Sequence, residues 1–214
     1  MQDGYSVDYT ELSKVRKQVL VERHLVSREH AARTTGCAVV IDRKQSISVM
    51  INEEDHFRLQ GIRPGLNLRG AYELVDRIDT EMDAALPYAF DGKLGFLTAC
   101  PTNLGTGMRA SVMLHLPGLV LLDQINPVIK AVGKIGLAVR GLYGEGTEAL
   151  GNLFQISNQH TLGESEPEII TQIEKVIEGV IRSEQTARAK LLEDHLTMLS
   201  DQVGRAYAVL RYAH

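Results

Sequence analysis

Two short apolar segments joined by a polar turn constrain the fold of this chain most strongly. They span residues 38–42 and 46–52, and the turn between them reads Asp-Arg-Lys-Gln. In the second segment Ile47, Val49 and Ile51 alternate with the serines or asparagine at positions 46, 48 and 52. Because a strand turns successive side chains to opposite faces, this pattern predicts one buried and one polar face. A connection this short joins antiparallel neighbours, so we predict a β-hairpin.

Helical periodicity marks other stretches of the chain. Apolar residues recur at steps of three and four over 9–28 and over 68–86, where Pro87 helps to end the helix. Ser165 begins a long helical region, in which Glu168 completes a capping box and Pro167 is tolerated in the first turn. The apolar positions of this region suit either a core or a dimer face; they are Ile169, Ile173, Val176 and Val180.

Further strands are predicted between these helices. They fall at 95–99, 109–115, 137–140 and 153–157, with a helix over 119–132 and a Gly-rich connection over 141–151. Strands linked as hairpins, with helices between and after them, indicate the α+β class. We therefore predict an antiparallel β-sheet flanked by helices and followed by a long C-terminal helical region.

Composition narrows the class of protein. Hydrophobic residues make up 44% of the 214 positions and charged residues 23%, which is typical of a globular chain. The 23 Lys and Arg against 27 Asp and Glu give a net charge of −4, which disfavours nucleic acid as a partner. No Ser- or Pro-rich linker interrupts the chain, so we expect one domain over residues 1–214.

The same sequence indicates a location. No apolar run approaches the roughly 18 residues that a membrane span needs, and residues 1–9 contain no apolar signal-peptide core. Cys37 and Cys100 alone cannot form a disulfide framework or a zinc site. We expect a cytoplasmic protein without a membrane partner.

Three arginines stand beside loops at the ends of predicted strands: Arg58, Arg109 and Arg140. Each one alone is typical of a solvated surface arginine. Strand ends on one edge of a sheet can converge, and converging guanidinium groups bind phosphate oxygens through bidentate, charge-assisted hydrogen bonds. The pattern of three is therefore a candidate phosphate site.

The other candidate residues are ambiguous by themselves. Glu53, Glu54 and Asp55 form an acidic run of the kind found in solvated turns, and Glu145 stands in a Gly-rich loop. The pattern Gly-Thr-Gly at 105–107 matches neither a P-loop nor a dinucleotide fingerprint. Cys37, and Cys100 taken alone, are typical of buried filler, and His24 of a surface or half-buried histidine. No metal-ligand spacing is present.

Four segments together carry a family resemblance. They read Val-Glu-Arg-His-Leu at 21–25, Asn-Glu-Glu-Asp-His-Phe-Arg at 52–58, Leu-Thr-Ala-Cys-Pro-Thr-Asn-Leu-Gly-Thr-Gly-Met-Arg-Ala at 97–110 and Arg-Gly-Leu-Tyr-Gly-Glu-Gly at 140–146. In this order they resemble the signature blocks of the ATP:guanido phosphotransferases, the family of creatine kinase and arginine kinase. Residues 111–117 and 151–159 look like the bacterial branch that phosphorylates arginine side chains in proteins.

The resemblance implies a role for individual residues. The positions that match the family's ATP-binding residues are His24, Arg58, Arg109, Ala110, Ser111, Val112, Met113, Arg140, Gly141, Leu142, Tyr143, Gly144 and Glu145. Glu54 matches the principal catalytic carboxylate, Glu145 a second one, and Cys100 the reactive cysteine beside the guanidino group. The implied cofactors are ATP and a Mg²⁺ ion that is bound through the nucleotide, with no residue as a metal ligand. The implied partners are protein substrates that bear arginine, with an activator protein and a homodimer as further expectations.

The sequence also departs from the family pattern. Residues 1–20 contain no Ser-Ser-Arg-x-Arg segment, and the region after the long helix contains no Arg-Asp-x-x-Arg-Ala motif, which binds phosphoarginine in the bacterial branch. We therefore expect a guanido kinase catalytic core without those two regions. Two alternatives stay open: a non-catalytic nucleotide-binding or regulatory module, and a kinase of free arginine or a related guanidino metabolite.

Overall fold

The computed structural model describes residues 4–8, 11–141 and 150–213. The chain folds as two compact units. The first takes in Met1–Met108 with His160–Glu166, and the second Arg109–Gln159 with Pro167–His214. The expectation of one domain over the whole chain stays a prediction, and each unit is described by itself.

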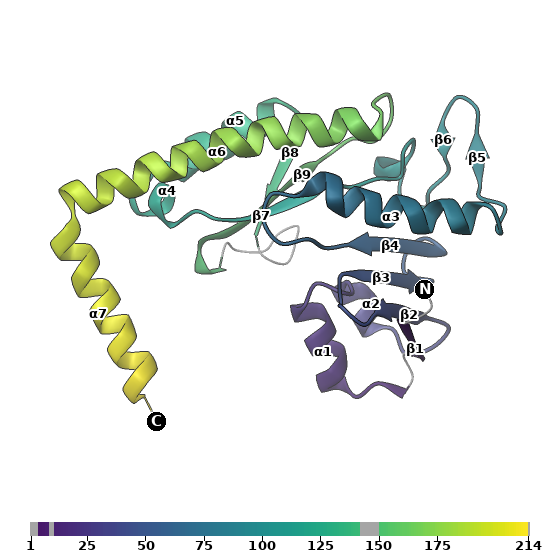
Figure 1. Ribbon diagram of the computed structural model, residues 1–214, viewed down its shortest axis with the longest axis horizontal. Coiled ribbons are helices and arrows are strands. Elements are labelled where there is room, and N and C mark those ends of the chain that lie inside the picture. Colours follow the sequence, from purple (N-terminus) through teal and green to yellow (C-terminus); the bar gives the residue numbers. More distant parts are fainter. Residues whose placement is uncertain (1–3, 9–10, 142–149, 214) are drawn as a thin grey trace. The chain divides into compact units, whose positions relative to one another are not determined.

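The first unit is built on a four-stranded antiparallel sheet. Its strands are β1 (Gly4–Asp8), β2 (Ala38–Asp42), β3 (Ile47–Ile51) and β4 (Phe57–Gly61), in the order β1-β2-β3-β4 (Figure 1). The predicted hairpin is confirmed as β2 and β3, in which Val40 pairs with Val49. The carboxylate of Asp42 fixes its turn by accepting hydrogen bonds from the backbone N–H groups of Ser46 (2.7 Å) and Ile47 (2.8 Å).

Helices cover both faces of β3. The helices α1 (Lys14–Glu22) and α2 (Arg28–Ala32) replace the single helix predicted over 9–28, and Val21 of α1 packs in one core with Val39 and Met50. The helix predicted over 68–86 is confirmed as α3 (Leu68–Asp83). It lies along β4, where a Cβ at Gly61 would meet a methyl of Val75 at 2.8 Å. Because both faces of β3 are covered, Ser48 is fully buried. The prediction that β3 has one polar face is wrong.

A small hairpin and a loop complete the first unit. The hairpin consists of β5 (Phe90–Asp91) and β6 (Gly95–Phe96), so the strand predicted over 95–99 is shorter than expected. The loop after it contains a 3₁₀ turn, η2 (Pro101–Asn103), and closes where the N–H of Phe96 donates to the carbonyl of Gly105 (2.8 Å). Gly105 has φ 108°, and a Cβ there would stand 2.4 Å from the carbonyl oxygen of Thr161. Three backbone segments thus meet here without side chains between them.

The second unit is built on a three-stranded antiparallel sheet. Its strands are β7 (Ser111–His115), β8 (Leu137–Arg140) and β9 (Leu153–Asn158), in the order β7-β9-β8. A 3₁₀ turn, η3 (Leu150–Asn152), directly precedes β9. The helix predicted over 119–132 is two helices, α4 (Pro117–Leu121) and α5 (Ile125–Lys134). Asp123, with φ 55°, takes the left-handed conformation that separates them.

The predicted C-terminal helical region is confirmed as α6 (Glu166–Asp194) and α7 (Leu196–Tyr212). From Pro167 onward α6 belongs to the second unit, and it buries Ile169, Ile173 and Val180, so these positions form core. Deeper along the same face Glu184 is buried, and it accepts hydrogen bonds from the N–H groups of Gly118 (2.8 Å) and Leu119 (2.9 Å) at the start of α4. Among the described residues, no helix is long and apolar enough to cross a membrane.

Candidate active site

The connection between β3 and β4 holds the predicted catalytic carboxylate. We call residues 52–56 the acid loop. Asn52 takes φ 55°, and its N–H donates to the carbonyl of His56 (2.9 Å), which closes the loop on itself. The side-chain amide of Asn52 also donates to the carbonyl of Gly36 (2.8 Å). This bond ties the acid loop to the segment just before β2.

Glu53 is the buried anchor of the acid loop. It is only 7% exposed, and its carboxylate accepts hydrogen bonds from the hydroxyl of Ser27 (2.6 Å), from Arg58 Nη1 (3.0 Å) and from the N–H of Glu54 (2.8 Å). Burial alone raises the pKa of Glu53, but the Ser27 hydrogen bond, the charge of Arg58 and the Glu54 N–H together hold that pKa below its ordinary value. Glu53 is therefore an ionised side chain that orients its neighbours.

Asp55 ties the acid loop to the loop that carries Cys100. Its Oδ1 accepts a hydrogen bond from the N–H of Ala99 (2.6 Å), the residue before Cys100. We call residues 97–105 the cysteine loop. Within it the Cys100 Sγ lies 3.0 Å from the Thr102 hydroxyl, and the thiol is partly exposed. Two segments that are about forty residues apart in the sequence thus lie side by side.

Glu54 is exposed between these anchored neighbours. Among the described side chains of the acid loop, those of Asn52, Glu53 and Asp55 each bond to another part of the first unit, whereas Glu54 presents its carboxylate to solvent. Its backbone is held through the Glu53 carboxylate. The acid loop therefore presents the accessible carboxylate of Glu54 on a backbone that hydrogen bonds hold in place.

Arg58 and His24 lie on the same side of the first unit. The side chain of Arg58 is 48% exposed, so its pairing with Glu53 leaves part of it available to a ligand. His24 is exposed in the turn after α1 with φ 55°, and its carbonyl accepts a hydrogen bond from the side chain of Gln60. Residues 58 and 60 are two apart on β4 and thus point to one face of the sheet. The first unit therefore brings together Glu54, Arg58, Cys100 and the turn of His24.

The second unit contains the predicted nucleotide residues of β7 and β8. Met113 on β7 and Arg140 on β8 both pair in register with Gln155 of the central strand β9. The amide of Gln155 donates to the hydroxyl of Ser111 (3.0 Å), so this strand bridges the two outer ones.

The entry to β7 is also fixed. Arg109 is exposed at this point, and the N–H of Ala110 donates to Asn158 Oδ1 (2.8 Å). Val112 follows on β7, where it pairs with Ile156. Gly141, which follows β8, is buried. Leu142, Tyr143, Gly144 and Glu145 lie outside the described residues, so the structure does not locate the second predicted carboxylate.

Sequence reasoning missed several supporting residues. Ser27, Asp55, Gln155 and Asn158 were not predicted to act, and Glu53 was treated only as part of an acidic run. The bonds Ser27–Glu53, Asp55–Ala99, Gln155–Ser111 and Asn158–Ala110 join residues that are between 26 and 48 positions apart along the chain. A pattern read within one segment cannot detect bonds of this kind.

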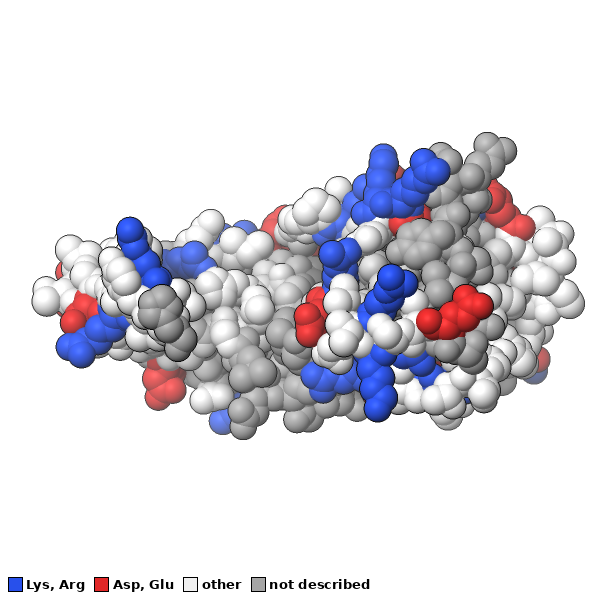
Figure 2. All heavy atoms as spheres, turned by 90° about the horizontal axis from the view of Figure 1, so that it is seen from below, with Lys and Arg blue, Asp and Glu red and all other residues white. Residues whose placement is uncertain are grey.

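The formal charge of the chain conceals an uneven distribution. Basic side chains gather on the face shown in Figure 2, with fewer acidic ones among them. In the first unit Lys14, Arg16 and Arg23 are exposed on α1 or directly after it. A net charge of −4 is therefore compatible with a surface that attracts anions.

The first unit thus presents the exposed carboxylate of Glu54 beside the partly exposed Arg58 and the loop of Cys100, and the comparisons with known proteins identify the family. The model of the ATP:guanido phosphotransferase C-terminal catalytic domain matches residues 2–187, and this chain belongs to that family. Among curated relatives, it is 51% identical to the protein-arginine kinase of Pelotomaculum thermopropionicum over 95% of this chain, and 49% identical to that of Caldanaerobacter subterraneus over 94%. The chain spans 57% and 60% of the lengths of these two relatives.

Solved structures confirm the predicted fold class. A lombricine kinase matches 88% of this chain with TM-score 0.73 and 25% identity, and 55% of that protein is covered. The duplicated taurocyamine kinase from Schistosoma mansoni, solved with bound transition-state analogue components, matches 85% with TM-score 0.72 and 30% identity, and 26% of it is covered. Both are similar to this chain in fold.

Proposed function

We propose that this chain transfers the γ-phosphoryl group of ATP to the guanidino group of arginine residues in proteins. The observation that carries the proposal is the acid loop, which anchors Glu53 and Asp55 and leaves Glu54 exposed beside Arg58 and the cysteine loop. The names of the relatives at about half identity support arginine in proteins as the acceptor. We further propose a cytoplasmic location, an activator protein and a homodimer.

The nucleotide would be held by cationic side chains and by β7. Arg58, Arg109 and Arg140 would contact the phosphates, and His24, Ala110 to Met113 and Gly141 to Glu145 complete the proposed nucleotide contacts. This donor set fits ATP because the half-exposed side chain of Arg58 is already oriented by Glu53, to which it donates through Nη1. Mg²⁺, carried by the nucleotide, would neutralise the part of the phosphate charge that the arginines do not neutralise.

The acceptor imposes a particular role on Glu54. The pKa of a guanidinium lies far above that of a glutamic acid, so a carboxylate cannot remove that proton in advance. Glu54 instead holds the guanidinium by paired hydrogen bonds and accepts the proton as the N–P bond forms and the bond from the γ-phosphorus to the bridging oxygen breaks. ADP leaves, and the proton passes to solvent.

Two further groups would assist this transfer. Glu145 would form the second side of the fork around the guanidinium, and Cys100, as a thiolate, would add a third negative contact. A planar cation with several N–H donors fits such a fork, whereas the ammonium of lysine does not. The site would therefore select arginine over lysine.

Radiolabelled ATP tests the proposal. The chain is incubated with an unfolded arginine-rich protein and, separately, with free arginine. Label on the protein that is lost in acid, as expected of a P–N bond, supports the proposal. Label on free arginine alone supports the metabolite kinase instead, and no transfer to either acceptor supports the non-catalytic module.

The variant Glu54→Gln identifies the catalytic group. It should abolish transfer while ATP binding stays near the wild-type affinity, because the carboxylate acts on the acceptor and not on the nucleotide. The matched control is Glu81→Gln, since Glu81 is an exposed carboxylate on α3 of the same unit. If Glu54→Gln lost phosphate transfer and ATP binding to the same extent, the catalytic role of Glu54 would be contradicted.

A further inference from the structure

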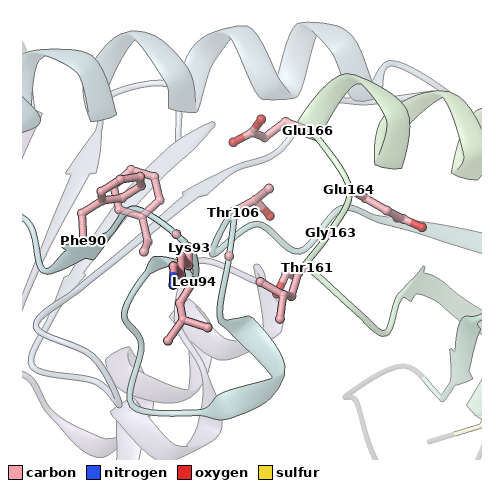
Figure 3. A pocket seen from close by; sticks show the side chains of 12 residues that line it. Phe90, Lys93, Leu94, Thr106, Thr161, Gly163, Glu164 and Glu166 are labelled. Carbon is pink, nitrogen blue, oxygen red and sulfur yellow. The ribbon is translucent and has the colours of Figure 1, made fainter.

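A pocket of the first unit lies outside the residues assigned to the reaction. It has a volume of about 280 Å³ and opens between the β5–β6 hairpin and residues 161–166 (Figure 3). We call it the hairpin pocket. The side chains that the argument uses are Phe90, Lys93, Leu94, Phe96, Leu162 and Glu166.

Several large apolar side chains of the hairpin pocket are exposed. Phe90, Leu94 and Leu162 are 62%, 43% and 51% exposed although they stand together around one hollow. The rings of Phe90 and Phe96 meet edge to face, with centroids 5.2 Å apart and planes at 71°. Clustered apolar side chains at a concave site indicate a surface that binds something.

The surroundings of the hairpin pocket are acidic. The Glu166 carboxylate points towards the side on which Phe90 lies, whereas Glu164 points away (Figure 3). The aromatic wall continues to Tyr88, whose ring lies 6.0 Å from that of Phe96 and whose hydroxyl donates to Asp79 of α3 (3.1 Å). Carboxylates therefore stand both at the rim and behind the aromatic wall.

These carboxylates crowd one another. Burial raises the pKa of Asp79, and the charges of Asp83, Asp76 and Glu166 raise it further against the lowering effect of the Tyr88 hydrogen bond. Burial and the charge of Asp79 likewise raise the pKa of Tyr88 to about 12. A cation in this place would relieve the repulsion. Lys93 lines the hairpin pocket as well, but it is exposed on the hairpin turn.

We propose that the hairpin pocket binds the side chain of a second arginine or lysine in the protein substrate. The aliphatic stem of that residue would lie against Leu94 and Leu162, and its cationic head would meet an aromatic face and the Glu166 carboxylate. The charge of the surroundings favours a basic side chain over any other that has an apolar stem. This inference rests on the proposed function, and it adds a preference for basic residues near the acceptor arginine.

The position of the hairpin pocket suits this role. Phe96 directly precedes the cysteine loop, and the hydroxyl of Thr161 donates to the carbonyls of Thr102 (3.0 Å) and Leu104 (2.6 Å) in that loop. One wall of the hairpin pocket is thus built on the backbone that carries Cys100. A peptide whose acceptor arginine lies near Cys100 has the hairpin pocket within the reach of nearby residues.

Paired peptides test the inference. Each peptide carries one acceptor arginine and a second arginine at one of a series of spacings, and its twin carries glutamine in the second place. Peptide binding to the full chain is followed by fluorescence anisotropy, and phosphate transfer by radiolabelled ATP. The wild-type chain should prefer the dibasic peptide by about fivefold to tenfold at the best spacing, as expected for one exposed cation–π contact plus one ion pair.

Three variants sharpen the test. Phe90→Ala and Glu166→Gln should each remove most of this preference, and Lys93→Gln should increase it, because the competing cation is gone. The controls are Tyr212→Ala, an exposed aromatic residue of α7, and Glu178→Gln, an exposed carboxylate of α6, which should change nothing. All variants should keep wild-type affinity for ATP.

The outcomes separate the two proposals. A preference in binding that Phe90→Ala and Glu166→Gln abolish supports the hairpin pocket even if no phosphate is transferred, in which case only the proposed function fails. Equal binding of each peptide and its twin by the wild-type chain, or a preference that Phe90→Ala and Glu166→Gln leave intact, overturns the hairpin pocket as the site.

Discussion

Glu53 and Glu54 are adjacent and chemically identical, yet the fold places them in opposite environments. Glu53 points inward to Ser27 and Arg58, and Glu54 is exposed to solvent. A strand end that enters a tight loop turns neighbouring side chains to different sides, so one carboxylate can support the other. The acidic run therefore contains a positioning residue and a candidate catalytic residue side by side.

Replacing Glu53 should damage stability and nucleotide handling together. Glu53→Gln keeps the size of the side chain but removes the charge that pairs with Arg58. A charge-assisted hydrogen bond contributes about 1.5–3 kcal/mol, so we expect a loss of that order in the free energy of unfolding and a raised KM for ATP. Urea denaturation and initial-rate kinetics measure the two effects. Glu54→Gln is the control, since it should leave the unfolding free energy unchanged.

The same residue should contribute to acid sensitivity. The pKa of Glu53 is lowered in the folded chain from an ordinary value of 4.5, so its stabilisation is present above about pH 4.5 and is lost as the pH falls through the folded value. We expect the unfolding free energy of the wild type to fall more steeply below pH 4.5 than that of Glu53→Gln. Denaturation curves at a series of acid pH values check this, and parallel curves for the two proteins would contradict it.

The sequence indicated candidate reacting residues but not the residues that support them. Glu54, Arg58 and Cys100 could be assigned because they stand within segments that resemble family blocks, although their roles stay predictions. The supporting bonds of Ser27 and Asp55 could not be predicted, because each reaches a residue on a different segment. Only the folded backbone brings those segments together.

At the scale of elements, a buried carboxylate ties α6 to α4. Glu184 accepts hydrogen bonds from two N–H groups at the start of α4 and from Arg188 Nε (2.6 Å), and Arg188 Nη2 donates to the carbonyl of His115 at the end of β7 (3.2 Å). Helix N-termini leave N–H groups without partners inside the helix, and a carboxylate is their best acceptor. The tie therefore fixes the end of the strand on which Ser111 to Met113 lie.

Removing this tie should destabilise the second unit strongly. Glu184→Ala leaves two buried N–H groups without their acceptor, and each such group costs about 1–3 kcal/mol, so we expect a loss of about 2–5 kcal/mol in unfolding free energy. Glu178→Ala is a matched control on the same helix, because Glu178 pairs with Arg182 at 3.9 Å and is 59% exposed. It should cost less than about 1 kcal/mol. Similar losses in both variants, measured by thermal denaturation, would refute this account.

Elements with regular periodicity were predictable, and elements with irregular ends were not. The stripe over 68–86 produced α3, and the alternation over 46–52 produced β3. The helix predicted over 119–132 failed because a left-handed residue at Asp123 interrupts an otherwise apolar stretch. The strands β1 and β4 went unpredicted, since each shows only two apolar residues in alternation, Tyr5 and Val7 in β1 and Phe57 and Leu59 in β4.

At the scale of the molecule, the two units have separate cores. Met50 is fully buried in the first unit and Ile173 in the second. A large-to-small change in either core costs about 2–5 kcal/mol. The effect should stay within the unit that contains the change, because the packing contacts of each residue lie there.

Hydrogen exchange of core variants tests this independence. Met50→Ala should accelerate amide exchange in β2, β3 and β4 while β7 and β9 keep wild-type rates, and Ile173→Ala should do the reverse. Each variant is the control for the other. Uniform acceleration through both units in either variant would show that they unfold as one.

The absence of a side chain at Gly105 limits how this chain can change. A Cβ at Gly105 would stand within 3 Å of backbone atoms of Thr161 and Leu162, so even alanine would push these backbone segments apart. A Cβ at Gly95 would in turn stand within 3 Å of the backbone of Gly105. The first glycine of the Gly-Thr-Gly pattern is thus explained by crowding between main chains, without reference to phosphate. A selection that randomised position 105 and demanded only a folded product should return a single amino acid.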